Sequence, residues 1–169
     1  EIVGNYYSTL FQDAWTVADY MNQKKEILEG DSRKFSQAFF SSTLPGYVLE
    51  AVADNITILR SPTCFRTENG DFFGWEGVEN TVGCGAGTCT HVWNYAQTVA
   101  FLFPELEQSM RRIEFLQEIQ ADGYMPFRTY RPFGLPAWEM LPSADGQLGA
   151  VVRLYREWRL SGDNRLIEY

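Results

Sequence analysis

The stretch VWNYAQTVAFLFPELEQSMRRIEFL, residues 92–116, contains two helical patterns that meet at a single proline. Before Pro104, apolar side chains recur at the spacing of one helix face; they are Val92, Tyr95, Val99 and Phe103. After the proline the pattern continues at Leu106, Met110, Ile113 and Leu116. Proline suits the first turn of a helix, where its missing N–H has no helical partner. The stretch therefore predicts two successive helices with almost no linker between them.

The N-terminal part of the chain repeats this pattern. Residues 9–28 are expected to form a helix, with apolar residues at Leu10, Ala14, Val17 and Met21. Gly30 is expected to end that helix, and Asp31 or Ser32 to cap the next one. The next helix carries Phe35, Ala38 and Phe39. A third helix is expected after Pro45, with a buried stripe formed by Val48, Val52, Ile56 and Leu59.

The last helix is expected at about residues 147–160. Its apolar positions are Leu148, Val151, Val152 and Tyr155, and we expect them to face the core. Trp15 and Trp158 lie within helical patterns and are also expected in the core.

One segment between the helices reads differently. In TCFRTENGDFF, residues 63–73, Asn69-Gly70 separates two short aromatic runs, a strong signal for a β-hairpin. Residues 74–88 follow with five of the fourteen glycines and no periodicity. Such glycine content indicates unusual backbone conformations or a closely approaching ligand. The sequence thus predicts a mostly α domain, a helical array or toroid, with one short hairpin at residues 63–75.

Composition restricts the function. A formal net charge of −8, with the basic residues scattered, argues against binding to nucleic acid. No stretch has the roughly 18 apolar residues that a membrane span needs. Three cysteines cannot form a complete disulfide framework, and the N-terminal residues carry no readable targeting signal, so the compartment stays open.

Four ordered motifs resemble a known enzyme family. They are FFGWEG (72–77), CTHVWNYAQ (89–97), FLFPELE (101–107) and ADGQLG (144–149). Together they are similar to the catalytic region of glycoside hydrolase family 116, which includes non-lysosomal glucosylceramidase and bile-acid β-glucosidase. The match covers about residues 44–163 and looks closer to the bacterial branch of the family.

The resemblance implies part of an (α/α)6 toroid that hydrolyses β-glycosides with retention. Retaining enzymes use two carboxyl groups about 5–5.5 Å apart, one as nucleophile and one as acid/base. The family nucleophile falls on Glu76, in a Gly-rich aromatic segment where a sugar ring could stack on Trp75. A plain structural role for Glu76, as a helix cap or a partner of an arginine, is the alternative.

Two departures from the family pattern matter. The family's acid/base Asp lies downstream of the matched region, so we expect roughly half of a catalytic domain here, inactive without the remainder of its parent. The expected sugar contacts are also altered. Where the family has a His-Asp pair that holds sugar hydroxyl groups, this chain has Met125-Pro126-Phe127-Arg128. Where the family has a sugar-binding Asp, this chain has His91. Asp145 could contact a hydroxyl group, or it could cap a helix.

Two other functions remain open. Cys64, Cys84, Cys89 and His91 could hold a structural zinc ion, although Cys-x4-Cys-x-His is not a standard zinc motif, and we expect no metal or cofactor. The tryptophans, with Trp75, Trp93 and Trp138 as candidates outside the two core positions, could instead line a cleft in a non-catalytic carbohydrate-binding module.

Overall fold

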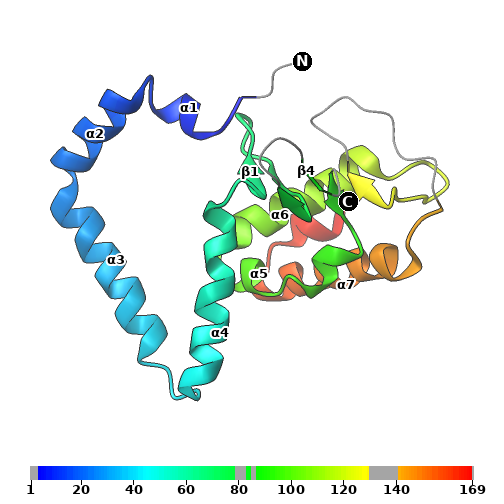
Figure 1. Cartoon of the computed structure of the whole chain (residues 1–169). Helices are drawn as coiled ribbons and strands as arrows, with labels where there is room; N and C mark the ends of the chain where they lie inside the picture. Colours follow the sequence, from blue (N-terminus) through cyan, green and yellow to red (C-terminus); the bar gives the residue numbers. More distant parts are fainter. Residues whose placement is uncertain (1–3, 79–82, 85–86, 130–140, 169) are drawn as a thin grey trace.

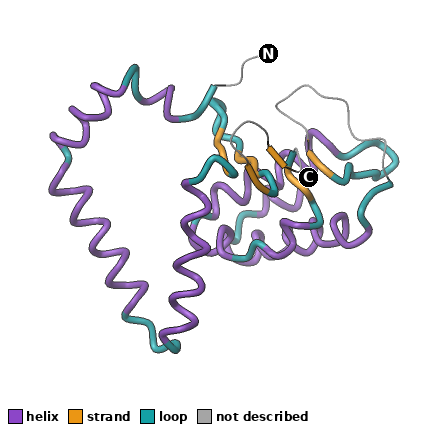
Figure 2. The backbone as a smooth tube through the Cα atoms, in the orientation of Figure 1, coloured by secondary structure: helices purple, strands orange, loops and turns teal. Residues whose placement is uncertain are grey.

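The computed structural model describes residues 4–78, 83–84, 87–129 and 141–168. Within these ranges the chain is mostly helical, as the sequence predicts (Figures 1 and 2). The α-helices are α1 (Tyr7–Leu10), α2 (Ala14–Gln23), α3 (Lys25–Phe40), α4 (Gly46–Ile56), α5 (Thr98–Leu102), α6 (Pro104–Ile113) and α7 (Ala144–Ser161). Short 3-10 helices are η1 (Thr57–Arg60), η2 (Val92–Tyr95) and η4 (Asn164–Glu168), and one π-helical turn, η3 (Glu114–Glu118), extends α6.

Helices α1, α2 and α3 form an arm that stands away from the rest of the molecule. In Figure 1 the chain descends along α3 and returns along α4, so that the two helices form the sides of a V. None of the arm's residues is buried. Trp15, which we expected in the core, is 80% exposed, so that prediction is wrong. The reason is that an apolar stripe is buried only where a partner surface meets it, and no described element packs on α2 from the opposite side.

The expected helix end at Gly30 is also wrong. Helix α3 runs through Gly30, and the break between α2 and α3 lies at Lys24, whose φ and ψ are −108° and 12°. A glycine inside a helix costs only about 1 kcal/mol relative to alanine. The ion pair of Glu29 with Arg33 spans Gly30 and that of Asp31 with Lys34 follows it, and both support the continuous helix.

The expected hairpin is confirmed. Strands β1 (Cys64–Arg66) and β2 (Phe72–Gly74) pair in antiparallel fashion, with Phe65 opposite Phe73. Gly70 has a φ of 90°, the left-handed conformation that glycine adopts without strain in such a turn. Two further ladders, which the sequence did not predict, join β3 (Gly77–Val78) to β4 (Gly83–Cys84) and β5 (Thr88–Cys89) to β6 (Arg128–Thr129).

The hairpin also anchors the start of the chain. Asn5 forms an isolated β-bridge with Thr67, and the Tyr6 amide donates to the carbonyl of Arg66 at 2.9 Å. The Arg66 guanidinium lies 4.0 Å from the centre of the Tyr6 ring. This contact holds the first described residues against the outer side of β1.

The hydrophobic core lies where the hairpin meets α5 and α6. Its buried members are Cys64, Phe72, Trp93, Val99 and Met110, and Leu59, Ala96, Phe103 and Leu106 pack around them. Pro104 occupies the first turn of α6, as the sequence predicts.

The single helix expected before Pro104 is instead two short ones, η2 and α5. The side-chain amide of Asn94 donates to the backbone carbonyl of Asp145 in α7 at 2.8 Å, and the side-chain amide of Gln97 donates to the backbone carbonyl of Asn94 at 2.8 Å. These contacts favour a break near residue 96, which the spacing of apolar residues does not reveal.

Helix α7 presents the opposite face from the one predicted. Leu148, Val151, Val152 and Tyr155 are 68%, 53%, 66% and 57% exposed, so their expected inward orientation is wrong. The helix buries Gly146, Ala150, Arg153 and Glu157 instead. The reason is that α6, on which α7 packs, presents buried charged side chains, and these require charged partners. Of the helices described, none is both long and apolar enough to cross a bilayer.

Candidate active site

Glu76 lies two residues after the end of β2, at a point where the backbone is held from both sides. The Gly74 amide donates to the Thr88 hydroxyl at 3.2 Å, and the Trp75 amide donates to the Thr63 carbonyl at 2.7 Å. The Trp93 indole lies so close to Gly74 that any Cβ there would overlap it. The strand that leads to Glu76 is therefore fixed by its neighbours.

The Glu76 carboxylate forms an ion pair with Arg128. The guanidinium donates from Nη2 to Oε1 of Glu76, across 52 residues of sequence. The Arg128 side chain is only 9% exposed, whereas that of Glu76 is 31% exposed. Oε2 of Glu76 makes no hydrogen bond within the described part of the chain. One oxygen is thus held and the other is left accessible.

The β5–β6 ladder brings Arg128 to this position. Cys89 of β5 lies opposite Arg128 of β6, and the Thr90 amide donates to the Phe127 carbonyl at 3.0 Å. The Arg128 guanidinium also lies 5.4 Å from the centre of the Phe127 ring. Arg128, expected as a substrate contact, is therefore a partner of the proposed nucleophile.

A second hydrogen-bonded pair joins two other predicted site residues. Nδ1 of His91 contacts the Asp145 carboxylate, which also accepts a hydrogen bond from the Ser143 hydroxyl. These hydrogen bonds, that of Ser143 first and that of His91 second, lower the pKa of Asp145 below its usual range. Ser143, whose hydroxyl accepts from the Gly146 amide at 3.2 Å, takes the capping role that we considered for Asp145.

The two pairs are linked through the backbone at the end of β5. Cys89 is opposite Arg128, and His91 follows Cys89 by two residues. Gly146, next to Asp145, packs against Thr90 and lies close to the His91 amide. The fold thus collects four predicted site residues, Glu76, Arg128, His91 and Asp145, around the end of β5.

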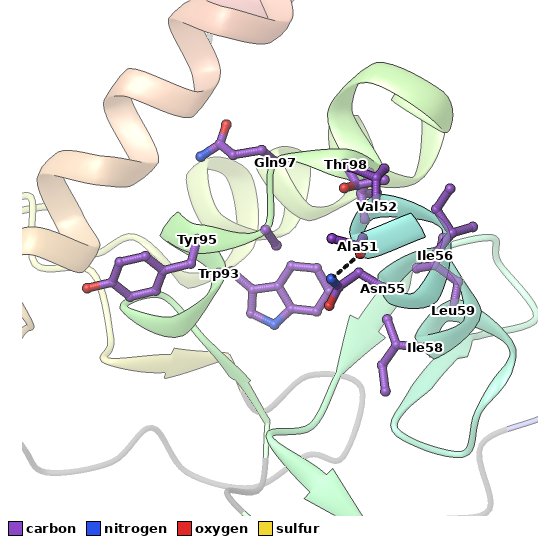
Figure 3. Close-up of a pocket in the computed structure, with 12 residues that line it drawn as sticks. Ala51, Val52, Asn55, Ile56, Ile58, Leu59, Trp93, Tyr95, Gln97 and Thr98 are labelled. Atoms are coloured by element: carbon purple, nitrogen blue, oxygen red, sulfur yellow. Dashed lines mark hydrogen bonds between the residues drawn. The ribbon is translucent and has the colours of Figure 1, made fainter. Parts of the chain in front are cut away.

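The two tryptophans of the predicted site point to different places. Trp93 is buried in the core, with its ring edge-on to Phe72 at a centroid distance of 5.9 Å. Its indole also lines an apolar cavity of about 370 Å³ between α4 and α5. In Figure 3 the indole points toward Asn55, while the Tyr95 ring points away. The primary role of Trp93 is therefore packing.

Trp75 lines a different and wider cavity of about 580 Å³, formed by the hairpin and the start of the chain. Its other lining residues are Gly4, Asn5, Tyr7, Arg60, Ser61, Pro62, Cys64 and Phe65. The loop position Trp138, our other stacking candidate, lies outside the described residues.

The zinc hypothesis receives no support from the cysteines that are described. Cys64 and Cys89 are buried free thiols, and burial raises the pKa of Cys64 to about 11. Sγ of Cys89 accepts a hydrogen bond from the Val92 amide. The side chain of Cys84 lies outside the described residues. Within the described ranges, no three His, Cys, Asp or Glu side chains lie close enough together to hold a metal ion.

Sequence reasoning missed a large cluster of charged side chains in the described part of the chain. Three arginines and three glutamates of α6, η3 and α7 form a buried ion cluster: Glu107, Arg111, Glu114, Arg153, Arg156 and Glu157. Arg111 is fully buried, and its Nη1 lies 2.9 Å from Oε2 of Glu114. Burial raises the pKa of Glu107 and of Glu157 and lowers that of Arg153 to about 10. Helical i, i+4 and i, i+7 spacing of Glu and Arg on facing helices was the available signal.

Comparison of the sequence with models of known protein families gives no match, and comparison with curated proteins gives none either.

Proposed function

We propose that this chain is part of the catalytic domain of a retaining β-glycosidase in which Glu76 is the nucleophile. The observation that carries the proposal is the position of its carboxylate. It follows a fixed strand, Arg128 holds one of its oxygens, and the other oxygen is accessible. A nucleophilic carboxylate needs this combination, because attack on an anomeric carbon requires a positioned oxygen that is not already engaged.

Arg128 has a positioning role in this proposal. A charge-assisted hydrogen bond from a nearly buried guanidinium restricts the rotation of the Glu76 side chain. We propose that His91 and Asp145, at the end of the same ladder, contact sugar hydroxyl groups. An imidazole ring can donate or accept a hydrogen bond, and a carboxylate accepts one.

The exposed apolar face of α7 fits a larger helical domain. Leu148, Val151 and Val152 lie on one side of α7, opposite the face that packs on α6. In a helical toroid every helix packs against neighbours on both sides, which would cover these residues. The acid/base carboxyl group is proposed to lie in that further part of the parent protein.

The decisive test is covalent labelling of the parent protein. A 2-deoxy-2-fluoro-β-glycoside should trap the glycosyl-enzyme intermediate on the peptide that contains Glu76, detectable by mass spectrometry. Glu76→Gln should abolish labelling and reduce turnover of an aryl β-glucoside by at least about 10³-fold. Glu68→Gln, the same change at the other end of the hairpin, is the matched control and should leave turnover unchanged. A label on another residue would overturn the assignment.

A second measurement tests the partial-domain interpretation. The chain of 169 residues alone should not turn over an aryl β-glucoside, because retention requires two carboxyl groups and we place only one of them here. Clear turnover by the isolated chain, abolished by Glu76→Gln, would show that the second group lies within it.

A further inference from the structure

The wider cavity beside Trp75 combines an aromatic ring, a phenol and a cation. Trp75 and Tyr7 supply ring surfaces, and Asn5 supplies an amide. Sugars bind at such places because their C–H faces pack on aromatic rings while their hydroxyl groups meet polar side chains. Trp75 directly precedes Glu76 in the chain, although Glu76 itself does not line the cavity.

Arg60 gives the cavity its charge. It ends η1 and lines the cavity, and it forms no ion pair with any carboxylate in the described part of the chain. Among the described lining residues none is acidic. Glu68 packs against Gly4 but is not part of the wall. This is unusual for a chain with a net charge of −8, in which every other described arginine lies near a carboxylate, a carbonyl oxygen or an aromatic ring.

We propose that this cavity is a subsite for a sugar that carries a carboxylate, a uronic acid, with its ring on Trp75 and its carboxylate at Arg60. The inference rests on the proposed function for its place in a glycosidase, but the binding it predicts does not need catalysis. A guanidinium matches a carboxylate in charge and in planar two-point geometry. A neutral hexose can use the rings and the amide but gains nothing from the charge of Arg60.

The test is equilibrium binding of methyl β-D-glucuronide and methyl β-D-glucoside to the full chain, by calorimetry at low ionic strength. The glucuronide should bind about threefold to fivefold more tightly, the range expected for one solvent-exposed ion pair. Raising the salt concentration to about 0.5 M should remove most of that preference, because exposed charges are screened. Sodium acetate, which has the charge without the ring, should bind more weakly than either sugar.

Variants separate the two contacts. Arg60→Gln should abolish the preference for the glucuronide and leave binding of the glucoside unchanged. Arg159→Gln is the matched control, since Arg159 is also an exposed arginine beside a tryptophan, 5.9 Å from the Trp158 ring centre. It should keep the preference. Trp75→Ala should weaken both sugars, and Trp75→Phe, which retains a ring, should weaken them less.

Equal affinity for the two glycosides, a preference that survives Arg60→Gln, or no binding of either sugar would each overturn the proposal. The outcome is independent of the nucleophile assignment, because Arg60 sets the preference for the glucuronide over the glucoside, and this preference should persist in a Glu76→Gln chain. A failed labelling experiment with retained glucuronide preference would refute the glycosidase proposal and leave the subsite standing.

Discussion

The arm formed by α1, α2 and α3 and the pair formed by α6 and α7 place the same kinds of side chain in opposite positions. The arm exposes its large apolar residues, Trp15 and Phe35 among them, and has no buried residue. The pair, together with η3, buries five charged side chains at its contact, half-buries a sixth, Arg156, and exposes aliphatic residues on the far side of α7. Neither region follows the simple rule that apolar residues face inward.

The difference shows that the contact partner decides which face of a helix is buried. Helix α6 presents Glu107 and Arg111, the η3 turn that extends it presents Glu114, and a buried charge must be paired. Helix α7 therefore turns Arg153 and Glu157 toward α6 and leaves its apolar stripe outside. Among the described residues the arm meets no partner along most of its length, so its apolar stripe stays exposed.

The largest expected effect is at the centre of the buried ion cluster. Arg111→Met should destabilise the chain by about 3–5 kcal/mol, because it leaves Glu107 and Glu114 buried beside a missing charge. Urea unfolding followed by circular dichroism measures the change. Arg33→Met in the arm, which breaks an exposed pair with Glu29, is the control and should cost less than about 1 kcal/mol. Equal losses of stability in the two variants would contradict the expected contrast between the buried ion cluster and the arm.

A glycine in each region sharpens the comparison. Gly146→Ala should destabilise by about 1–3 kcal/mol, because its Cβ would overlap Thr90 and lie 3.0 Å from the His91 amide nitrogen. Gly30→Ala in α3 should instead stabilise by about 0.5–1 kcal/mol, because nothing lies near the new Cβ and alanine favours a helix. Thermal unfolding of both variants checks the opposite signs. A loss of stability at Gly30 would mean that the arm is packed in solution.

Between pH 4.5 and 8 the pH dependence of stability should come from the pair and not from the arm. Burial raises the pKa of Glu107 and Glu157 in the folded chain above the ordinary value of 4.5. The folded state then binds more protons than the unfolded state, so these groups lower stability as the pH rises from 4.5 through their raised pKa values. Asp13 and Asp145, whose pKa values are lowered, act with the opposite sign below 3.8.

The measurement is the free energy of unfolding against pH from 4.5 to 8. Glu107→Gln should flatten the slope in this window relative to the unmodified chain, whereas Glu29→Gln, an exposed arm residue, should leave it unchanged. A slope that is the same in all three chains would contradict the assignment.

The smallest effect is expected in the arm itself. Trp15→Ser should change the free energy of unfolding by less than about 0.5 kcal/mol, because the side chain is 80% exposed. Phe73→Ala in the hairpin, where the ring is buried and stacked on Phe65, should cost about 3–5 kcal/mol. A large loss at Trp15 would show that the arm is covered by another surface.

The sequence predicted those features that depend on a few neighbouring residues. Asn69-Gly70 located the hairpin, and Pro104 located the start of α6, because each restricts the backbone on its own. The face of α7 could not be predicted in the same way. It carries two stripes, one apolar and one with Arg153 and Glu157, and the choice depends on what α6 presents.

The candidate site also has a part that neighbouring residues reveal and a part that depends on distant partners. The residues Glu76, Arg128, His91 and Asp145 were identified from motifs, but their pairing was not. Glu76 meets Arg128 only because β5 and β6, strands of two residues each, join segments that lie about 40 residues apart. Two residues are too few to show any periodicity, so the ladder had no signal in the sequence.

The alkylation rate of the buried Cys64 thiol can report motions of the hairpin. Its pKa of about 11 leaves very little thiolate at neutral pH, and Cys64 is only 8% exposed. Iodoacetamide should therefore react slowly with Cys64 in the folded chain and faster when β1 separates from the core. The alkylation rate of Cys64, compared with that in urea, would report how often the strand that precedes Glu76 opens, without any added label.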